Sequence, residues 1–262
     1  LQATSLHQEI SDIQVHDTDV LPGEEASQEA VVEELREELV GRSFDFTRRH
    51  GKWLFVALDE GSDRYLVLHF GMTGGLQYFM DMEDEPEYDR VLFRFEDGYQ
   101  LAYLSQRKLG DVEVIDDVEQ FVQQKELGPD ALDPDLDLTA FKERVGDRRA
   151  MVKSVLMDQD TMAGIGNVYS DEILFQAGIH PRTKISRLDE ETLHQLFRTM
   201  KDVLQKAIEY QAQPEQFPES FIGPHRHEDG RCPLCGDELE RVQVGSRHAY
   251  FCPNRQGSRG RR

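Results

Sequence analysis

The cysteines near the end of the chain constrain its fold more than any other feature. Cys232 and Cys235 form a Cys-x-x-Cys pair, and Cys252 follows after sixteen intervening residues, within a strand-like run. Two such pairs facing each other across a hairpin are a strong signature of a tetrahedral zinc site. The position that would complete the second pair is Arg255, whose guanidinium stays protonated and cannot bind a metal. The segment therefore predicts a β-hairpin that carries three of the four zinc ligands.

Two interpretations of this incomplete site follow from the residues. In the first, the thiolates hold zinc, and a water or a nearby histidine (His225, His227 or His248) fills the fourth position. In the second, the hairpin folds by packing alone and the metal has been lost. All three cysteines lie in the last thirty-one residues, and an odd, clustered count argues against the disulfide framework of a secreted protein. We therefore expect a cytoplasmic protein.

The rest of the chain changes from a strand pattern to a helix pattern. Up to residue 110, short runs of β-branched and aromatic residues alternate with turn residues. An acidic, proline-containing link at 111–138 follows, and four helical patterns then lead to residue 210. We expect an α+β multidomain protein, with an N-terminal β-sandwich at 1–115, a helical domain at 116–222 and a zinc-finger-like β-hairpin with a basic tail at 223–262. The predicted strands lie within 8–21, 43–50, 52–61, 64–72, 75–80, 90–98 and 99–106, and the predicted helices lie within 24–39, 138–146, 148–159, 167–178 and 189–210.

Charge is distributed unevenly along the chain. The net charge is -21, yet the 22 residues after Glu240 contain six arginines and no acid. The acidity speaks against nucleic-acid binding, while the basic end needs an explanation of its own. Only eight lysines stand against 51 acidic residues, a balance that suits a salt-rich cytoplasm, where a hydrated acidic surface keeps a protein in solution. No apolar run approaches the length of a membrane span, and none at the start resembles a signal peptide.

Asn167 lies at the point where a glycine-rich turn changes into a helical pattern. Gly164 and Gly166 precede it. The free N–H groups at the start of a helix favour a bound phosphate, and the asparagine amide would add a further contact. The alternative is a plain helix N-cap, a role that asparagine commonly fills.

Three turns in the strand-rich half carry side chains of interest. Lys52 follows Gly51 and opens a strand, so it would lie at a cationic rim; the alternative is a solvated hairpin. Met72 lies on one glycine-rich tip, and Arg107 and Leu109 lie on a second. Apolar side chains on such tips can act as wedges in a stacked duplex. The alternative for Met72 is a side chain folded back onto the core.

Four stretches together resemble the formamidopyrimidine-DNA glycosylase and endonuclease VIII family. They are GKWLF (51–55), LHFGMTGGL (68–76), AGIGNVYSDEILFQAGIHP (163–181) and the cysteine hairpin, in the family's order and spacing. The third is similar to the family's helix–two-turns–helix signature. The resemblance implies a base-excision repair enzyme that grips damaged duplex DNA between two domains and flips the damaged nucleotide out of the stack. An amine, in this family an N-terminal proline followed by a glutamate, then expels the base and forms a Schiff base that leads to strand cleavage.

The resemblance also implies roles for individual residues. Residues in both halves of the chain would contact phosphates. Side chains on the two glycine-rich tips would fill the gap that the flipped nucleotide leaves in the base stack, and the hairpin would hold zinc. The phosphate contacts are Lys52, His69, Lys153, Asn167 and Arg247; the stack is filled by Met72, Arg107 and Leu109; the zinc ligands are Cys232, Cys235 and Cys252. Such a basic groove is local and so is compatible with an acidic chain. The implied partner is damaged double-stranded DNA, bound by a monomer at the bacterial nucleoid.

Two departures from the family leave alternatives open. No Pro-Glu pair stands at the start, and LQATSLHQEI resembles the end of the family's first helix and the strand after it. We therefore expect that about three to four helical turns, together with the nucleophile, precede this sequence in a complete enzyme. The alternative is that the Lys52 amine forms the Schiff base at an abasic site.

Arg255, in the place of the fourth cysteine, is the second departure. We therefore expect the protein to bind less than a full equivalent of zinc. The competing functions are a non-catalytic binder of damaged DNA and a zinc-hairpin module that binds a protein partner.

The acidic, lysine-poor composition predicts how stability responds to salt. We expect the free energy of unfolding to rise between low and molar KCl, because screening removes repulsion among the carboxylates. Urea titrations at a series of KCl concentrations measure this directly. A stability that falls over the same range would rule out adaptation to a salt-rich cytoplasm.

Overall fold

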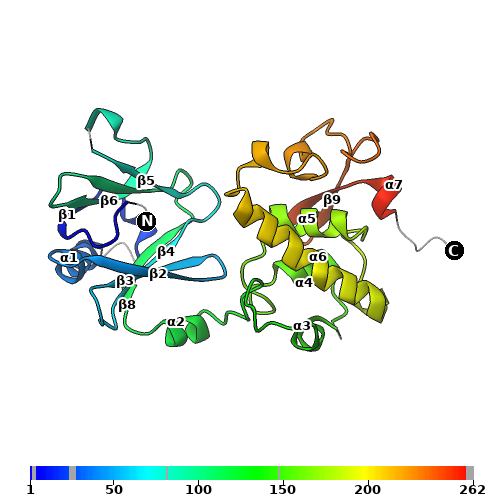
Figure 1. The fold of residues 1–262 in the computed structure, drawn as a ribbon, viewed down its shortest axis with the longest axis horizontal. Coiled ribbons are helices and arrows are strands. Elements are labelled where there is room, and N and C mark those ends of the chain that lie inside the picture. Colours follow the sequence, from blue (N-terminus) through cyan, green and yellow to red (C-terminus); the bar gives the residue numbers. More distant parts are fainter. Residues whose placement is uncertain (2–3, 24–27, 81, 147, 258–262) are drawn as a thin grey trace. The chain divides into compact units, whose positions relative to one another are not determined.

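The computed structural model describes residues 1, 4–23, 28–80, 82–146 and 148–257. The chain divides into two compact units, Leu1–Lys125 and Glu126–Arg262 (Figure 1). Each unit has its own hydrophobic core and is described by itself. The chain divides after residue 125, and the second unit includes the hairpin. The finer division into three domains, at 1–115, 116–222 and 223–262, stays a prediction.

The first unit is a sandwich of two four-stranded antiparallel sheets. One sheet has the strand order β1-β6-β7-β5 and the other has the order β2-β3-β4-β8. The strands are β1 (Ile10–Val15), β2 (Phe44–His50), β3 (Trp53–Leu58), β4 (Tyr65–His69), β5 (Gly75–Phe79), β6 (Asp89–Phe95), β7 (Gln100–Leu104) and β8 (Asp111–Ile115). Phe44 of β2 packs edge-on against Phe93 and Phe95 of β6, with ring centroids 5.8 and 5.9 Å apart. These contacts join the two sheets, so the predicted sandwich is confirmed.

Helix α1 (Gln28–Leu39) lies in the chain between β1 and β2. Its buried side chains, Leu35 and Leu39, are spaced one helical turn apart and join the core of the sandwich. The helix predicted for 24–39 is confirmed over the described part, and its first four residues lie outside the described residues.

The link predicted at 111–138 is wrong at its beginning, where the chain forms β8. This strand pairs antiparallel with β4, and Val112 is opposite Leu68. Val112 is buried while Asp111 is exposed, so the strand alternates as a sheet surface requires. Its acidic residues conceal the pattern in the sequence. Helix α2 (Val118–Gln124) follows, begun by Asp117, whose side chain accepts a hydrogen bond from the Gln120 N–H group.

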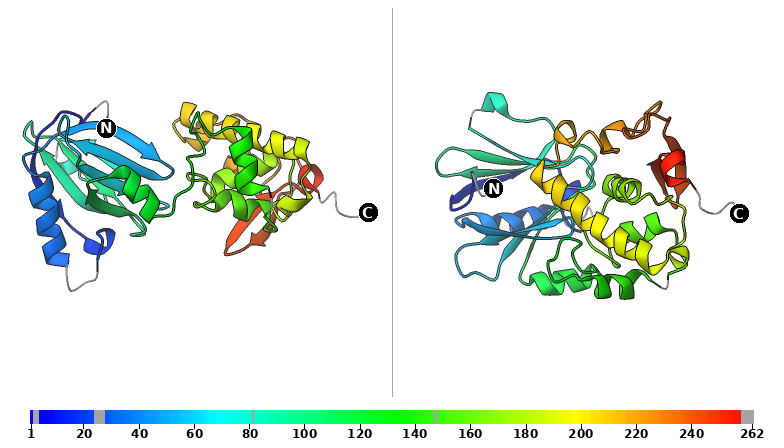
Figure 2. Two further views of the ribbon diagram at one scale, coloured as in Figure 1. Left: turned by 90° about the horizontal axis from the view of Figure 1, so that it is seen from below. Right: turned by 45° about the vertical axis from the view of Figure 1, so that its right-hand side comes forward.

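The second unit is helical, and the four predicted helices are present. They are α3 (Leu138–Val145), α4 (Val152–Met157), α5 (Asn167–Gln176) and α6 (Glu190–Glu209). The long helix α6, yellow in Figure 2, packs against α3 and α5. Leu193, Leu196, Met200 and Val203 on its buried face contribute to the core of the unit. Among the described residues, no helix is long and apolar enough to cross a membrane.

The cysteine segment closes the chain as the predicted hairpin. Strands β9 (Glu240–Val244) and β10 (Arg247–Phe251) pair antiparallel, and the short helix α7 (Pro253–Gln256) follows. Both β10 and α7 pack against α5. Helix α5 therefore supports the hairpin on one side and the helical core on the other.

Candidate DNA-binding surfaces and metal centre

Met72, Arg107 and Leu109 form an exposed cluster on the first unit. Met72 and Leu109 are 53% and 51% exposed, which is high for large apolar side chains. The Arg107 Nη1 atom lies 3.9 Å from the Met72 sulfur. The two tips come this close because Gly71 has no side chain: a Cβ atom there would lie 2.6 Å from the Leu109 carbonyl oxygen. The interpretation of Met72 as a core residue is therefore wrong.

A buried tyrosine fixes the base of this cluster. The Tyr103 hydroxyl donates a 2.6 Å hydrogen bond to the carbonyl oxygen of His69, at the end of β4. Gly110 lies directly over this bond, since a Cβ atom at that position would be 1.9 Å from the hydroxyl. Burial raises the pKa of Tyr103 far above its ordinary value, so the hydroxyl keeps its proton. The tip that carries Leu109 thus rests on a rigid support.

His69 and Lys52 lie at the same rim of the first unit. The His69 ring packs against Trp53 at an interplanar angle of 32°, with centroids 4.6 Å apart. Burial lowers the pKa of the His69 imidazole; the Asp111 carboxylate opposes this shift, and the positive charge of Lys52 adds to it. His69 is therefore neutral near pH 7, and its buried Nδ1 atom has no hydrogen-bond partner in the described part of the chain. Lys52 occupies the turn between β2 and β3, next to Gly51, which has a positive φ of 59°.

Asn167 is the first residue of α5. The N-cap position is held by Gly166, with no side-chain hydrogen bond, so the interpretation of Asn167 as a plain N-cap is wrong. The Asn167 side-chain oxygen is buried and has no hydrogen-bond partner among the described residues. A buried polar atom in this state is costly unless an outside group completes its bonding. The start of α5 therefore combines an amide whose oxygen lacks a partner among the described residues with the N–H groups that the first turn of a helix leaves without an intrahelical acceptor.

Lys153 is fully enclosed rather than presented at a surface. Its ammonium donates to Asp171 Oδ1 at 2.6 Å, to Ser170 Oγ at 2.8 Å and to the Asn167 carbonyl oxygen at 3.2 Å. Burial lowers the pKa of Lys153, and the Asp171 carboxylate opposes this shift. The direct phosphate contact predicted for Lys153 stays a prediction. In the structure Lys153 holds the first turn of α5.

Asp171 has a second oxygen, which ties the hairpin to the helices. Oδ2 accepts hydrogen bonds from the Arg226 guanidinium at 2.8 and 3.0 Å and from the Tyr250 N–H group at 3.1 Å. The carboxylate is completely buried and satisfied by two cations. Lys153, Asp171 and Arg226 therefore form an ion triad around a buried carboxylate, and the triad joins α4, α5 and the segment before the cysteines, while the Tyr250 N–H group attaches β10 to it.

Arg247 lies at the exposed tip of the cysteine hairpin. It is the first residue of β10 and pairs with Val244 across the turn. Gly245, with a positive φ of 57°, allows this tight reversal. The hairpin thus presents an arginine at its outer end while its inner end packs on α5.

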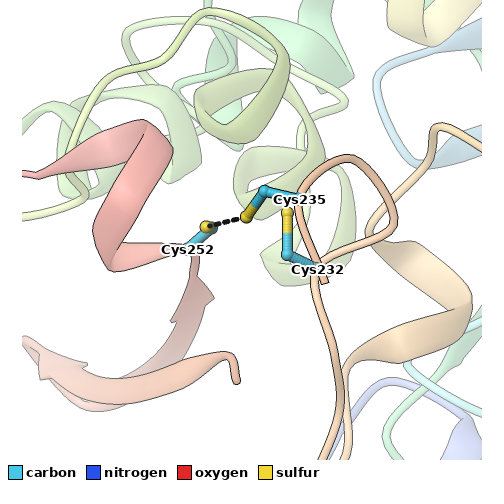
Figure 3. A group of neighbouring side chains, drawn as sticks. All are labelled: Cys232, Cys235 and Cys252. Carbon is cyan, nitrogen blue, oxygen red and sulfur yellow. Dashed lines mark hydrogen bonds between the residues drawn. The ribbon is translucent and has the colours of Figure 1, made fainter. Parts of the chain in front are cut away.

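The three cysteines converge at the inner end of the hairpin (Figure 3). Their sulfur atoms lie within 4.8 Å of one another, and those of Cys235 and Cys252 are 3.5 Å apart. In a tetrahedral site, zinc–sulfur bonds of about 2.3 Å separate the sulfurs by about 3.8 Å. Burial opposes ionisation of Cys232, but hydrogen bonds from the Leu234 and Cys235 N–H groups outweigh it and lower its pKa. The donor set fits zinc at three positions.

Comparison with known proteins assigns the family. Three family models match in succession: the formamidopyrimidine-DNA glycosylase N-terminal domain at 1–112, the H2TH domain at 127–218 and a zinc finger found in FPG and IleRS at 230–254. The chain is 32% identical over 241 residues to the formamidopyrimidine-DNA glycosylase of Streptococcus pneumoniae, covering 86% of this chain and 85% of that protein. The chain belongs to the formamidopyrimidine-DNA glycosylase family.

Solved structures of this family have the same fold. The Lactococcus lactis Fpg in complex with DNA containing an abasic site matches with a TM-score of 0.84 and 28% identity, over 98% of this chain and 95% of that one. The same enzyme bound to DNA containing N7-benzyl-Fapy-dG matches with a TM-score of 0.84 and 27% identity, over the same shares of both chains. The predicted family and fold class are therefore confirmed, and the zinc-finger match supports metal binding by the cysteine cluster.

The sequence interpretation missed the residues that position this glycosylase-family site. Asp171, Arg226 and Tyr103 were not predicted. A signal for Asp171 does exist: it lies in an α5 segment, Ser170 to Phe175, in which every residue is buried. A carboxylate there requires partners, but only the tertiary structure identifies them as Lys153 and Arg226.

The buried triad leads to a prediction about stability. We expect Asp171→Asn to lower the free energy of unfolding by about 3–5 kcal/mol, because two enclosed cations lose their shared anion. The control is Asp160→Asn, at an exposed acid of the same unit, which should change stability by less than about 0.5 kcal/mol. Urea denaturation followed by circular dichroism measures both. Equal stabilities of the two variants would contradict a structural role for the triad.

Proposed function

We propose that this protein is a base-excision repair DNA glycosylase with abasic-site lyase activity, acting on oxidised bases in duplex DNA. The relatives are named formamidopyrimidine-DNA glycosylase, and the matching structures contain abasic-site or Fapy-dG DNA. The observation that carries the proposal is the exposed cluster of Met72, Arg107 and Leu109. Large apolar side chains on a rigid tip suit a site that enters a base stack after a nucleotide is flipped out.

Each unit supplies part of the DNA-binding surface in this proposal. In the first, Met72 and Leu109 fill the vacated stack, Arg107 faces the orphaned base, and Lys52 and His69 hold phosphates. In the second, Asn167 at the start of α5 and Arg247 at the hairpin tip hold phosphates, while Lys153 acts through the backbone of Asn167. Neutralisation of phosphates is local, so a net charge of -21 does not oppose it.

The amine that attacks C1′ is the remaining chemical requirement. The family's nucleophile is an N-terminal proline, whereas the first residue of this sequence is Leu1. We include Lys52 as a candidate amine for Schiff-base formation at abasic sites, because it lies at the rim that also carries His69. Zinc, when bound, would be held by Cys232, Cys235 and Cys252 at the inner end of the hairpin that carries Arg247. We infer that the protein acts in the cytoplasm, at the nucleoid, an inference that DNA as substrate and three free thiols support, and we expect a monomer.

Binding to matched duplexes tests the DNA-binding surface. We expect Met72→Ala to reduce the preference for an abasic-site duplex over an intact one by about tenfold, or ~1.4 kcal/mol, because the wedge is truncated. Arg247→Ala should weaken binding to both duplexes alike and reduce the salt slope by about one unit. Fluorescence anisotropy at several KCl concentrations gives both quantities.

The controls are a methionine and an arginine at comparable positions elsewhere. Met80 is also 53% exposed on the first unit, and Arg241 is an exposed arginine of the same hairpin. Met80→Ala should leave the abasic-site preference unchanged, and Arg241→Ala should affect binding less than Arg247→Ala. Equal effects of Met72→Ala and Met80→Ala would exclude the wedge.

Borohydride trapping separates an enzyme from a non-catalytic binder. With abasic-site duplex, a Schiff base is reduced to a stable protein–DNA adduct, and peptide mapping locates it. We expect an adduct on the N-terminal proline of the complete protein. Lys52 is the second candidate, and an adduct on it would be lost in Lys52→Arg, whose guanidinium cannot form a Schiff base. Tight abasic-site binding without any adduct in the complete protein would favour a binder of damaged DNA that lacks lyase chemistry.

A further inference from the structure

We infer that the three cysteines form an open metal site, in which zinc is bound by Cys232, Cys235 and Cys252 and by one exogenous ligand. We infer further that the hairpin keeps its fold and position without the metal. Within the described residues no histidine, aspartate or glutamate side chain joins the cysteine cluster. His225, His227 and His248 therefore do not complete the site.

The backbone around Arg255 retains the geometry of a metal-binding turn. At Cys232, the N–H group four residues later, that of Gly236, donates to the cysteine carbonyl oxygen at 2.9 Å. At Cys252, the N–H group four residues later, that of Gln256, donates to the cysteine carbonyl oxygen in the same way, at 2.8 Å. Cys232 and Cys252 are also each followed directly by proline, whereas Cys235 is followed by Gly236. Arg255 thus occupies the place in the second turn that Cys235 occupies in the first.

The Arg255 side chain lies against Phe175 of α5 and does not bind a metal. Its guanidinium lies 5.9 Å from the centre of the Phe175 ring of α5, a distance at which a cation is attracted to an aromatic face. Phe175 also packs against Cys232 and Cys252 in one apolar cluster. The arginine therefore contributes packing to the hairpin and leaves one vertex of the zinc tetrahedron open.

Contacts other than metal bonds attach the hairpin to the helical unit at three places. The buried Gln256 side chain donates to the Ile179 carbonyl oxygen and accepts from the Cys252 N–H group, both at 2.9 Å. The Tyr250 N–H group donates to Asp171. Arg182 donates twice to the Gln243 carbonyl oxygen, at 2.9 and 3.1 Å. These bonds anchor both strands and α7, so the fold of the hairpin does not depend on a fourth cysteine.

An open position changes what the metal site can do. Zinc with three protein ligands binds a water or another small donor at the fourth position, as catalytic zinc sites do. It also loses the free energy of one thiolate bond, so it exchanges with chelators more readily than a closed structural site. We expect Arg255→Cys to close the site, because its backbone already has the required turn.

Cobalt spectroscopy and chelator competition test this inference on the full chain. We expect Co²⁺ bound to the natural sequence to show a ligand-field spectrum that shifts when imidazole is added. Co²⁺ bound to Arg255→Cys should show additional thiolate charge-transfer absorbance and no response to imidazole. Arg255→Cys should also retain Zn²⁺ at least about 100-fold more tightly against a chromophoric chelator. Arg255→Ala is the control, since it removes the arginine without adding a ligand and should still respond to imidazole.

Hydrogen exchange tests the second half of the inference. Amide protection of Glu240–Val244 and Arg247–Phe251 should be the same in metal-free and zinc-loaded protein of the natural sequence. Loss of that protection on removing zinc would overturn the metal-independent hairpin. A Co²⁺ spectrum insensitive to imidazole, with a zinc affinity equal to that of Arg255→Cys, would show that the chain itself supplies a fourth ligand and would overturn the open site.

Discussion

The completely buried carboxylate of Asp171 connects α4, α5 and the hairpin of the second unit. Asp171 binds the Lys153 ammonium through one oxygen and binds the Arg226 guanidinium and the Tyr250 N–H group through the other. An enclosed charge is stable only when its partners are complete, so each of these groups depends on the others. Through Lys153 the same network reaches the Asn167 carbonyl oxygen. The start of α5 and the arginine-bearing hairpin are therefore positioned by one ion cluster rather than separately.

The hairpin has contacts to the helices that would keep its fold in the open metal site that we infer. In a small zinc finger the metal supplies much of the folding free energy. Here hydrogen bonds of Gln256, Arg182 and Asp171 join the hairpin and α7 to the helices, and Phe175 packs against both buried cysteines. The Arg255 guanidinium lies 5.9 Å from the centre of the Phe175 ring. In the open site that we infer, zinc binding and hairpin folding are separable properties.

In the first unit, two turns hold the apolar side chains of Met72 and Leu109 exposed to water. Exposed tips are usually mobile, since few contacts restrain them. The absence of a side chain at Gly71 and Gly110 lets the two tips approach each other and the Tyr103 hydroxyl. In the proposed function, preorganisation of this kind would lower the entropic cost of inserting the tips into DNA.

The sequence by itself determined the family, the order of sandwich, helices and hairpin, and the positions of the turns that carry Lys52, Met72, Leu109 and Arg247. Periodicity, glycine placement and cysteine spacing are local properties, and local properties can be read along a chain. The tertiary structure alone decided the partners of Asp171, the hydrogen bond between Tyr103 and His69, the burial of Lys153 and the stacking of Arg255. Strand β8 was also recognised only there, because its acidic residues resemble a linker until β4 pairs with it. Each of these depends on groups far apart in the sequence, and burial gives their contacts a strength that no local pattern encodes.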